Sequence, residues 1–451
     1  MREIIAPQLP LIAVPFGHAH ARELAEVSRI LDALPEAAAL VHADLVRHVR
    51  NPKVGREGMS GEQVLRVLLV KQMTGFSYEH LVFHLGDSTS YRAFCKLGFG
   101  EPPPTKSTLK RNLKRVRAET IEKINQLMLH VAEDRGVEKG RKVRFDCTVE
   151  ETNIHEPSDS SLLWDCVRVL TRGMVNGREW VSVPFRDHTL RAKRRSIGIQ
   201  YAKTKKVRTK LYRDLLEVTR ATVQSAQRVA AALDECKVAG PMEYARVEAQ
   251  AEELKHYVGL AQRVIEQTTR RVVSGEKVAA KDKIVSIFEP HTDIIVKDRR
   301  DTFYGHKICL ATGASGLVLD CRIEDGNPAD ATLAVEMVRR QADLFDCVPR
   351  QVAFDGGFAS KANLKAIKEL GVQDVMFSKK RGLQIADMAK SKRVYNGLRR
   401  FRAGIEAGIS YLKRCFGLDR CTWRSLDSFK SYTWASILAA NLITLARHAS
   451  S

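Results

Sequence analysis

Apolar residues recur at helical spacing through the first third of the chain. Residues 20–34 form one such stretch, which predicts a single helix. Between residues 59 and 98, short helical patterns alternate with turn signals. Ser60 and Ser77 stand at N-cap positions before two of these patterns, and Gly75 ends the first of them. This region is therefore expected to fold as several short helices.

A basic helical pattern closes this region and is expected to begin with Ser107 as its N-cap. Short helices that end in a basic helix are typical of helix-turn-helix domains. We therefore expect a helical DNA-binding domain at residues 58–135, after an N-terminal helical segment at residues 1–57. A solvated helix face would explain any single lysine there almost as well. The cations expected to contact DNA are Lys106, Lys110, Arg111 and Lys114.

The period of the pattern changes to two at residues 140–154. Val143, Phe145 and Cys147 fall on one face, and Asp146 falls on the other. Because successive side chains of a strand point to opposite faces, this alternation predicts a strand with one apolar and one polar face.

A second helical region follows, and we expect it to be an insertion at residues 156–282. Residues 160–170 predict one helix, and two long apolar seams joined at residues 238–241 predict an antiparallel helical hairpin, for which simple packing is a sufficient role. The stretch 186–210 holds ten Lys or Arg against one Asp. Charge runs are usually solvated faces, but this density of one sign favours an anionic partner. Its cations expected to contact DNA include Arg194, Arg195, Lys205 and Lys206.

Strand patterns resume near residue 283. Residues 283–290 predict a short strand, and residues 305–327 predict a β-hairpin around a glycine-rich turn. Helices and strands then alternate to residue 378. This order predicts an α/β fold with a mixed sheet, interrupted by the helical insertion after its first strand. The core is expected at residues 140–155 plus 283–425, followed by a C-terminal core helix at residues 426–451.

Three carboxylates stand where such a sheet would bring them together. Asp146 lies on the polar face of the first strand, and Asp355 ends a later strand in "VAFDGGF". Glu406 lies in a helical pattern, with Arg402 four residues before it and Lys413 seven residues after it. These three therefore share one helix face. An ordinary Asp-Gly turn and an ordinary salt-bridge ladder are the simpler readings of these positions.

Two glycines weaken the simpler reading of the helix. Gly404 and Gly408 flank Glu406, and each mid-helix glycine costs about 1 kcal/mol relative to alanine. The close approach of a strand, a metal site or a phosphate backbone would account for them. Three acids on an α/β scaffold suit a pair of Mg²⁺ ions, which activate water and steady the leaving oxygen in phosphodiester cleavage.

The charge of the chain points to its partner. Lys and Arg number 74 and Asp and Glu 53, which gives a net charge of +21. This excess favours nucleic acid first and a membrane surface second. No segment is long and apolar enough to predict a membrane span. Nine cysteines without any Cys-x-x-Cys pair are typical of a reducing cytoplasm, where we expect the protein.

The sequence resembles the DDE transposases of bacterial insertion sequences, most closely the ISNCY family. "VRFDCTVEETNIHEPSDSSLLWDCVRVL" is similar to the first-aspartate region, and "AFDGGFAS" to the second. "RAGIEAGISYLKR" matches the Arg-x3-Glu-x6-Lys part of the glutamate signature. "GNPADAT" resembles the Asn-x2-Asp element after the third strand. The block at residues 59–98 looks like the amino-terminal helical domain of such enzymes. The resemblance covers most of the chain.

The resemblance implies an RNase H-like core that cuts element ends and transfers strands with Mg²⁺, for which Mn²⁺ would substitute. It implies that Asp146, Asp355 and Glu406 bind two metal ions, and that Arg402 and Lys413 contact DNA nearby. The helical N-terminal domain would bind the terminal inverted repeats. Partners would be double-stranded DNA and a second copy of the chain, in a bacterial, nucleoid-associated setting. The wider signature has Tyr where this chain has Arg399, which we take as a further DNA contact.

Two other functions fit the same residues. A metal-dependent nuclease with the same core would cut nucleic acid without transposing it. A silent element protein would bind DNA through its basic surface without cutting it. The complete acid triad favours the transposase.

Overall fold

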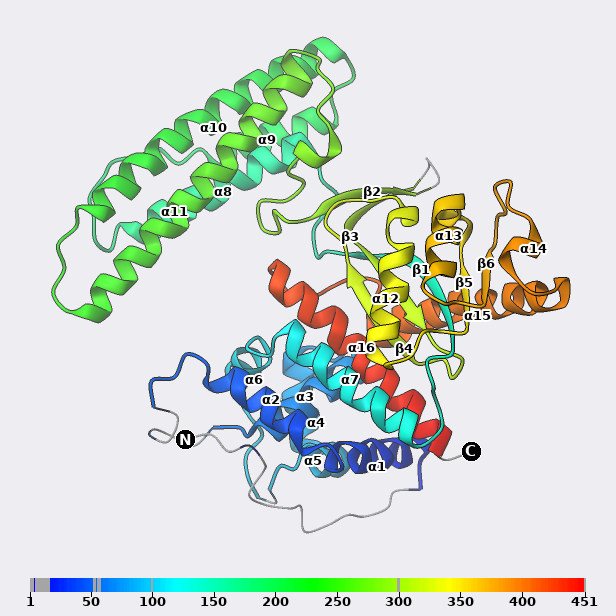
Figure 1. Ribbon diagram of the computed structural model, residues 1–451. Coiled ribbons are helices and arrows are strands. Elements are labelled where there is room, and N and C mark those ends of the chain that lie inside the picture. The colour runs from blue at the N-terminus through cyan, green and yellow to red at the C-terminus, as the bar shows by residue number, and fades with distance from the viewer. Residues whose placement is uncertain are drawn as a thin grey trace. The chain divides into compact units, whose positions relative to one another are not determined.

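The computed structural model describes residues 4, 17–51, 54, 58–98, 100–297 and 301–449. The chain divides into two compact units. We call residues 1–152 and 305–451 the α/β unit and residues 153–304 the inserted unit; both are drawn in Figure 1. The expected return to the α/β core at residue 283 falls earlier than this boundary, and Ile284 and Ile287 belong to the hydrophobic core of the inserted helices.

The α/β unit is built around strand β1 (Lys142–Glu151). Strand β3 (Asp301–Thr312) pairs with it antiparallel on one side, and β5 (Gln351–Phe354) pairs parallel on the other. Strand β4 (Val318–Ile323) continues the sheet antiparallel to β3, and β6 (Asp374–Phe377) continues it parallel to β5. The order β4-β3-β1-β5-β6 confirms the predicted mixed α/β sheet.

The two faces of β1 have different roles. Phe145 stacks on Phe354 of β5 at 4.6 Å between ring centroids, and Phe358 and Phe377 extend this aromatic layer. All four rings are buried. The opposite face carries Asp146 and meets helix α15, which also contacts β5 and β6. The period-two pattern of the sequence therefore separates the apolar core from the carboxylate. The helices packed on or near this sheet are α12 (Ala334–Leu344), α13 (Lys361–Glu369), α14 (Ile385–Met388), α15 (Lys392–Phe416) and α16 (Leu426–Ala449).

The amino-terminal helices share one hydrophobic core with the sheet. Helix α16 packs against three of them, which explains why it is buried along most of its length. Ser60 forms a capping box with Gln63, Ser77 caps the next helix, and Gly75 adopts the left-handed conformation that ends a helix. The helices are α1 (Ala19–Asp32), α2 (Pro35–Val46), α3 (Gly61–Thr74), α4 (Tyr78–Asp87), α5 (Thr89–Phe94), α6 (Lys106–Leu113) and α7 (Ala118–Asp134).

The expected basic helix is two helices, and Ser107 is not its cap. Thr105 caps α6 by accepting a hydrogen bond from the backbone N–H of Thr108. Helix α6 ends at Leu113, and Arg117, just before α7, is extended; its backbone N–H and Nε both donate to the carboxylate of Asp44, at 2.9 Å and 2.6 Å. This tertiary contact favours an extended residue where the local pattern predicted a continuous helix.

The inserted unit is helical and has its own hydrophobic core. Helices α10 and α11 pack along each other and form the hairpin that the apolar seams predicted (Figure 1). Both helices also pack against α8. A π-helical turn at Thr269–Val273 follows α11. The inserted unit also contains the short strand β2 (Asp293–Lys297). The main helices are α8 (Asp159–Gly177), α9 (Thr189–Gln200), α10 (Lys205–Asp234) and α11 (Pro241–Thr268).

The predicted strand at residues 283–290 does not form, and this segment is irregular. The side chain of Gln267 takes both backbone groups of Ile284: its Oε1 accepts from the N–H at 2.8 Å, and its Nε2 donates to the C=O at 3.2 Å. Ser286 then accepts from two following N–H groups. These side-chain partners replace the ladder that a strand would need.

Candidate active site

Two of the predicted carboxylates meet at neighbouring strands. The parallel register aligns Phe145 of β1 with Phe354 of β5. Asp146 and Asp355 are the next residues on the two chains, so they lie side by side where β5 ends. Asp146 is still within its strand, whereas Asp355 begins the turn that follows. The register thus satisfies the geometric condition that the sequence pattern left open.

A single guanidinium joins these two acids to the third. Arg402 of α15 donates through Nη2 to Asp146 Oδ2 at 2.9 Å, and the same nitrogen lies 3.2 Å from Asp355 Oδ1. Its Nη1 donates to Glu406 Oε1 at 2.7 Å, one helical turn further along. The three carboxylates predicted from three distant segments therefore converge on one cation. Their exposure differs: the side chain of Asp146 is 15% exposed, that of Asp355 38% and that of Glu406 65%.

The surroundings of Asp355 favour its ionised form. Burial alone would raise the pKa of this carboxyl. A hydrogen bond from Ser378 Oγ at 2.8 Å, backbone N–H groups of Gly356 and Gly357, and the charge of Arg402 together outweigh burial and lower the pKa. Asp355 is therefore an anion at neutral pH. Ser378 follows β6, and nothing in the local sequence marked it as a partner of the site.

The glycines around the site leave room for specific side chains. A Cβ on Gly356 would lie 2.6 Å from Lys379, and one on Gly357 would lie 2.3 Å from a carboxylate oxygen of Asp330. Asp330 belongs to the "GNPADAT" motif and forms an ion pair with the largely buried Lys307. The two glycines of "VAFDGGF" therefore allow other residues of the α/β unit to pack directly against the turn that carries Asp355.

One of the two helix glycines has the same explanation. A Cβ on Gly404 would lie 2.3 Å from Nη1 of Arg144, which donates to the backbone C=O of Phe401 at 2.8 Å. Close approach of strand β1 to α15 therefore accounts for Gly404. Apart from the backbone of its own helix and its chain neighbours, no atom in the described part of the chain lies within 4 Å of the corresponding position on Gly408, so packing does not account for that residue.

The three carboxylates are suitable ligands for a hard divalent cation, but in this structure they contact the guanidinium of Arg402. Carboxylate oxygens are the ligands that Mg²⁺ prefers, and one oxygen from each of the three acids lies beside the Arg402 guanidinium. Within the described residues, no three His, Cys, Asp or Glu side chains stand in a geometry that would hold a metal ion as they are. Arg402 lies between the acids and keeps them apart. As the side chains stand, the Arg402 guanidinium occupies the place among the three acids that a bound cation would take.

The other cations predicted near the site are on α15. Arg399 is exposed to solvent. Lys413 is partly buried and lies 3.3 Å from Asp419, so its charge is partly balanced within the chain. Tyr395, the tyrosine of this helix closest in sequence to Arg399, is buried, and its hydroxyl donates a hydrogen bond to the backbone C=O of Phe377. It is therefore part of the core and is not placed to contact DNA in this arrangement.

The basic residues predicted on α6 form an exposed face, while Leu109 and Leu113 are buried against the core. Lys106 of this face makes an ion pair with Glu79 of α4. The exposed cations of the face are Lys106, Lys110, Arg111 and Lys114.

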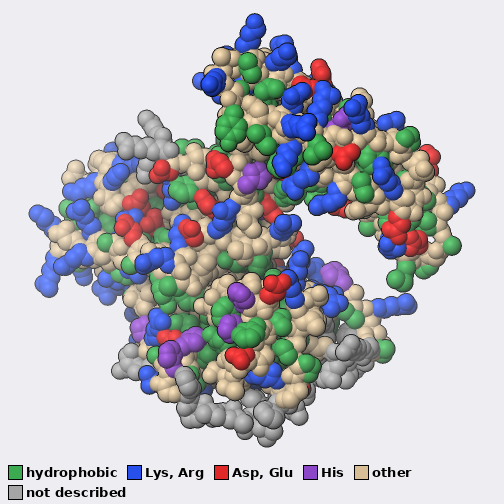
Figure 2. Space-filling view, turned by 180° about the vertical axis from the view of Figure 1, so that it is seen from behind, with side chains coloured by type: hydrophobic (Ala, Val, Ile, Leu, Met, Phe, Trp, Pro, Cys, Tyr) green, Lys and Arg blue, Asp and Glu red, His purple; other side chains and the backbone are tan. Residues whose placement is uncertain are grey.

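The cations predicted in the inserted unit divide into two groups. Arg195, together with Arg191, is bound to Asp214 of α10, so these two hold α9 in place. Arg194, Lys205 and Lys206 are exposed. Lys and Arg side chains are numerous on this unit in the space-filling view (Figure 2).

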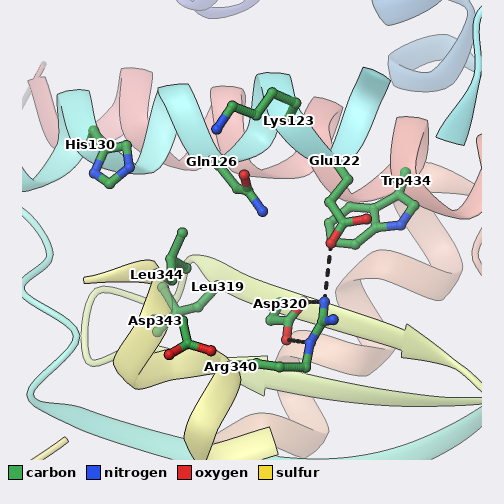
Figure 3. Close-up of a pocket in the computed structure, with 10 residues that line it drawn as sticks. All are labelled: Glu122, Lys123, Gln126, His130, Leu319, Asp320, Arg340, Asp343, Leu344 and Trp434. Atoms are coloured by element: carbon green, nitrogen blue, oxygen red, sulfur yellow. Dashed lines mark hydrogen bonds and ion pairs between the residues drawn. The ribbon is translucent and has the colours of Figure 1, made fainter. Parts of the chain in front are cut away.

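A separate pocket of about 270 Å³ lies between α7, β4, α12 and α16 (Figure 3). Arg340 donates to both oxygens of Asp320, at 2.6 and 2.7 Å, and to Glu122 at 3.1 Å. These charges satisfy one another, so we interpret the pocket as a joint that ties α7 to the sheet. No helix in the described part of the chain is long and apolar enough to cross a membrane.

Two segments of the chain match known protein families. Residues 286–442 match the family described as "Transposase DDE domain", and residues 15–115 match the family described as "Transposase domain (DUF772)". The first match contains Asp355 and Glu406, whereas Asp146 lies outside both. No curated protein and no solved structure matches the chain. Two segments of the chain are therefore similar to domains of transposases; the ISNCY assignment stays a prediction.

Proposed function

We propose that this chain, which carries two transposase domains, is an insertion-sequence transposase that cuts element ends and joins them to target DNA. The observation that supports this most strongly is the convergence of Asp146, Asp355 and Glu406 on Arg402. Three acids from β1, the end of β5 and α15 meet although hundreds of residues separate the first from the last. An ordinary salt bridge on a solvated helix face would need only Arg402 and Glu406.

The fold adds support for the RNase H-like core that the resemblance implies. In the α/β unit, β4, β3 and β1 are antiparallel neighbours, and β5 and β6 extend the sheet in parallel with β1. This order places the first acid on the central strand and the second on its parallel neighbour. We infer that the insertion leaves this core intact because it enters and leaves between β1 and β3.

The chain's own residues have distinct roles in this proposal. Asp146, Asp355 and Glu406 would hold two Mg²⁺ ions, with Mn²⁺ as a substitute. Bound there, the ions would supply an activated water and stabilise the leaving oxygen. Ser378 orients the Asp355 carboxylate by its hydrogen bond. Arg402 neutralises the acids beforehand and is freed to contact a phosphate when they bind cations.

The remaining cations would position DNA. Arg399 and Lys413 lie on the helix that carries Glu406 and would hold phosphates near the reacting bond. The exposed face of α6 would bind the terminal inverted repeats, and the cations of α9 and α10 would hold further backbone. Because two element ends must be brought together, we propose that two or more copies of the chain assemble on DNA.

The deciding experiment is a cleavage assay on a duplex from the flank of the gene. Mg²⁺-dependent cuts at the repeat boundary are expected, with loss of at least about a hundredfold in rate in Asp355→Asn, because a ligand of the metal site is removed. Glu369→Gln, an exposed acid on α13, is the matched control and should cut normally.

Each of the other outcomes would indicate a different function or a different site. Cuts spread over unrelated or branched DNA would indicate a nuclease. Tight binding without cuts, in Mg²⁺ and in Mn²⁺, would indicate a silent element protein. Normal cleavage by Asp355→Asn, Asp146→Asn and Glu406→Gln would overturn the proposed site.

A further inference from the structure

The outward side of α9 carries apolar residues that the fold leaves in solvent. Leu190 is 71% exposed, Ile197 45% and Tyr201, just past the helix end, 79%. Steps of four, three and four residues link Leu190, Arg194, Ile197 and Tyr201, so they lie on one stripe. Ala192, Ser196 and Ile199 are buried on the opposite side. We call this stripe the outer face of α9.

Cations surround this face and extend past the turn into α10. In the described part of the chain, no ion pair is seen for Lys193, Arg194, Lys203, Lys205 or Lys206, and all five are exposed. Arg191 and Arg195 differ, because Asp214 binds both. That bond fixes the orientation of α9, so its outer face is held toward solvent by the unit's own structure.

The charge identifies what would cover the face. A second copy docking through the same face would bring two sets of cations together, which costs energy. A membrane surface suits a helix with an unbroken apolar side, but here Arg194 sits within the apolar stripe. An exposed aromatic ring among cations is a pattern that binds nucleic acid strands, because bases stack on aromatic side chains while their phosphates contact cations.

We propose that the outer face of α9 binds DNA at nucleotides whose bases are unpaired, with Tyr201 stacking on a base. Arg194, Lys205 and Lys206 hold the phosphates on either side. In a paired duplex the base faces are covered by their neighbours, so Tyr201 would gain little there. This proposal rests on the proposed function for its DNA partner, but it concerns strand recognition and needs no cleavage.

The test measures binding of the full-length protein in EDTA, by fluorescence anisotropy. The probes are a fully paired duplex and the same duplex with a short run of mismatches. We expect tighter binding to the mismatched probe. Tyr201→Ala should weaken that binding about tenfold and leave the paired duplex nearly unchanged. Tyr201→Phe should retain the preference, because it keeps the ring.

The matched control is Tyr244→Ala, which removes another exposed tyrosine of the inserted unit, at the start of α11 beside Glu243. It should not change the preference. The proposal is overturned if wild type binds both probes equally, or if Tyr201→Ala weakens both alike. It is also overturned if Tyr201→Ala instead abolishes binding to phosphatidylserine vesicles and spares DNA. If the protein preferred the mismatched probe but showed no metal-dependent cleavage, the transposase function would be refuted. The proposed binding of unpaired bases by the outer face of α9 would still be supported.

Discussion

At the scale of single residues, Arg402 decides how the site is held without metal. It contacts Asp146, Asp355 and Glu406 at once, so it occupies the place of a cation among three anions. Removing Arg402 leaves three like charges close together. Their repulsion lowers the stability of the fold and strengthens the binding of any cation among them. The site is therefore predicted to exist in two states, one held by Arg402 and one held by metal.

We predict that Arg402→Gln binds Mn²⁺ about tenfold more tightly than wild type, equivalent to about 1.4 kcal/mol, because no internal cation competes. Its Tm without metal should fall, and added Mn²⁺ should recover most of the loss. Titration calorimetry without DNA and thermal unfolding would measure both. Lys413→Gln, a nearby cation bound to Asp419, is the control. Equal or weaker Mn²⁺ affinity in Arg402→Gln would contradict the two-state site.

The sequence led to the three acids and to Arg402, because strand alternation and helical spacing are local patterns. It did not lead to Ser378 or to Asp330 as a neighbour of Gly357, since those contacts depend on how β6 and the segment after β4 return to the site. The role of Arg402 was equally out of reach. Spacing placed it beside Glu406, but only the register of β1 and β5 brings both aspartates to it.

At the scale of elements, β1 also carries a buried acid away from the site. Glu150 is fully buried, and its Oε2 accepts a hydrogen bond from Thr433 of α16 at 2.6 Å. Burial raises the pKa of this carboxyl well above the ordinary 4.5. The folded state therefore keeps this proton at pH values where the unfolded state has lost it. Stability from this group falls as pH rises above about 4.5 toward the folded-state pKa.

We predict that Glu150→Gln is more stable than wild type at neutral pH, because the amide can accept the same hydrogen bond without the proton uptake that the buried carboxyl needs on folding. The wild-type free energy of unfolding should fall by up to about 1.4 kcal/mol per pH unit within this window, and the variant should lose that slope. Urea unfolding at a series of pH values measures it. Glu369→Gln, an exposed acid, should keep the slope, and an unchanged slope in Glu150→Gln would refute the assignment.

Helices and strands were largely predictable, because apolar spacing determines them wherever packing follows the local pattern. The exceptions have tertiary causes. Asp44 binds Arg117 and splits the basic helix, and Gln267 takes the backbone groups of Ile284 and prevents a strand. Such contacts join residues distant in sequence, so no window of neighbouring residues could reveal them.

At the scale of the whole molecule, a net charge of +21 would attract any polyanion, so charge alone does not show where DNA binds. Position separates the cations. Some are bound to acids of the chain, as Arg246 is to Glu179 and Glu243. Others, such as Lys110, Arg111 and Lys114 on α6, are exposed, and no ion pair is seen for them in the described part of the chain. Only cations that contact phosphates release counter-ions, so they should control how salt weakens binding.

We predict that replacing Lys110, Arg111 and Lys114 with Gln lowers the slope of log affinity against log salt concentration by about two to three, because each phosphate contact contributes about 0.9. The matched control replaces Arg246, Lys255 and Arg270, three exposed cations that the chain pairs with its own acids. Both triple variants carry the same net charge, so a general field effect would lower both slopes equally. Binding is measured on end-containing duplex in EDTA across a range of KCl concentrations. A lower slope in the α6 variant alone locates a DNA contact on that helix, whereas equal slopes in the two variants would remove α6 from the proposed interface.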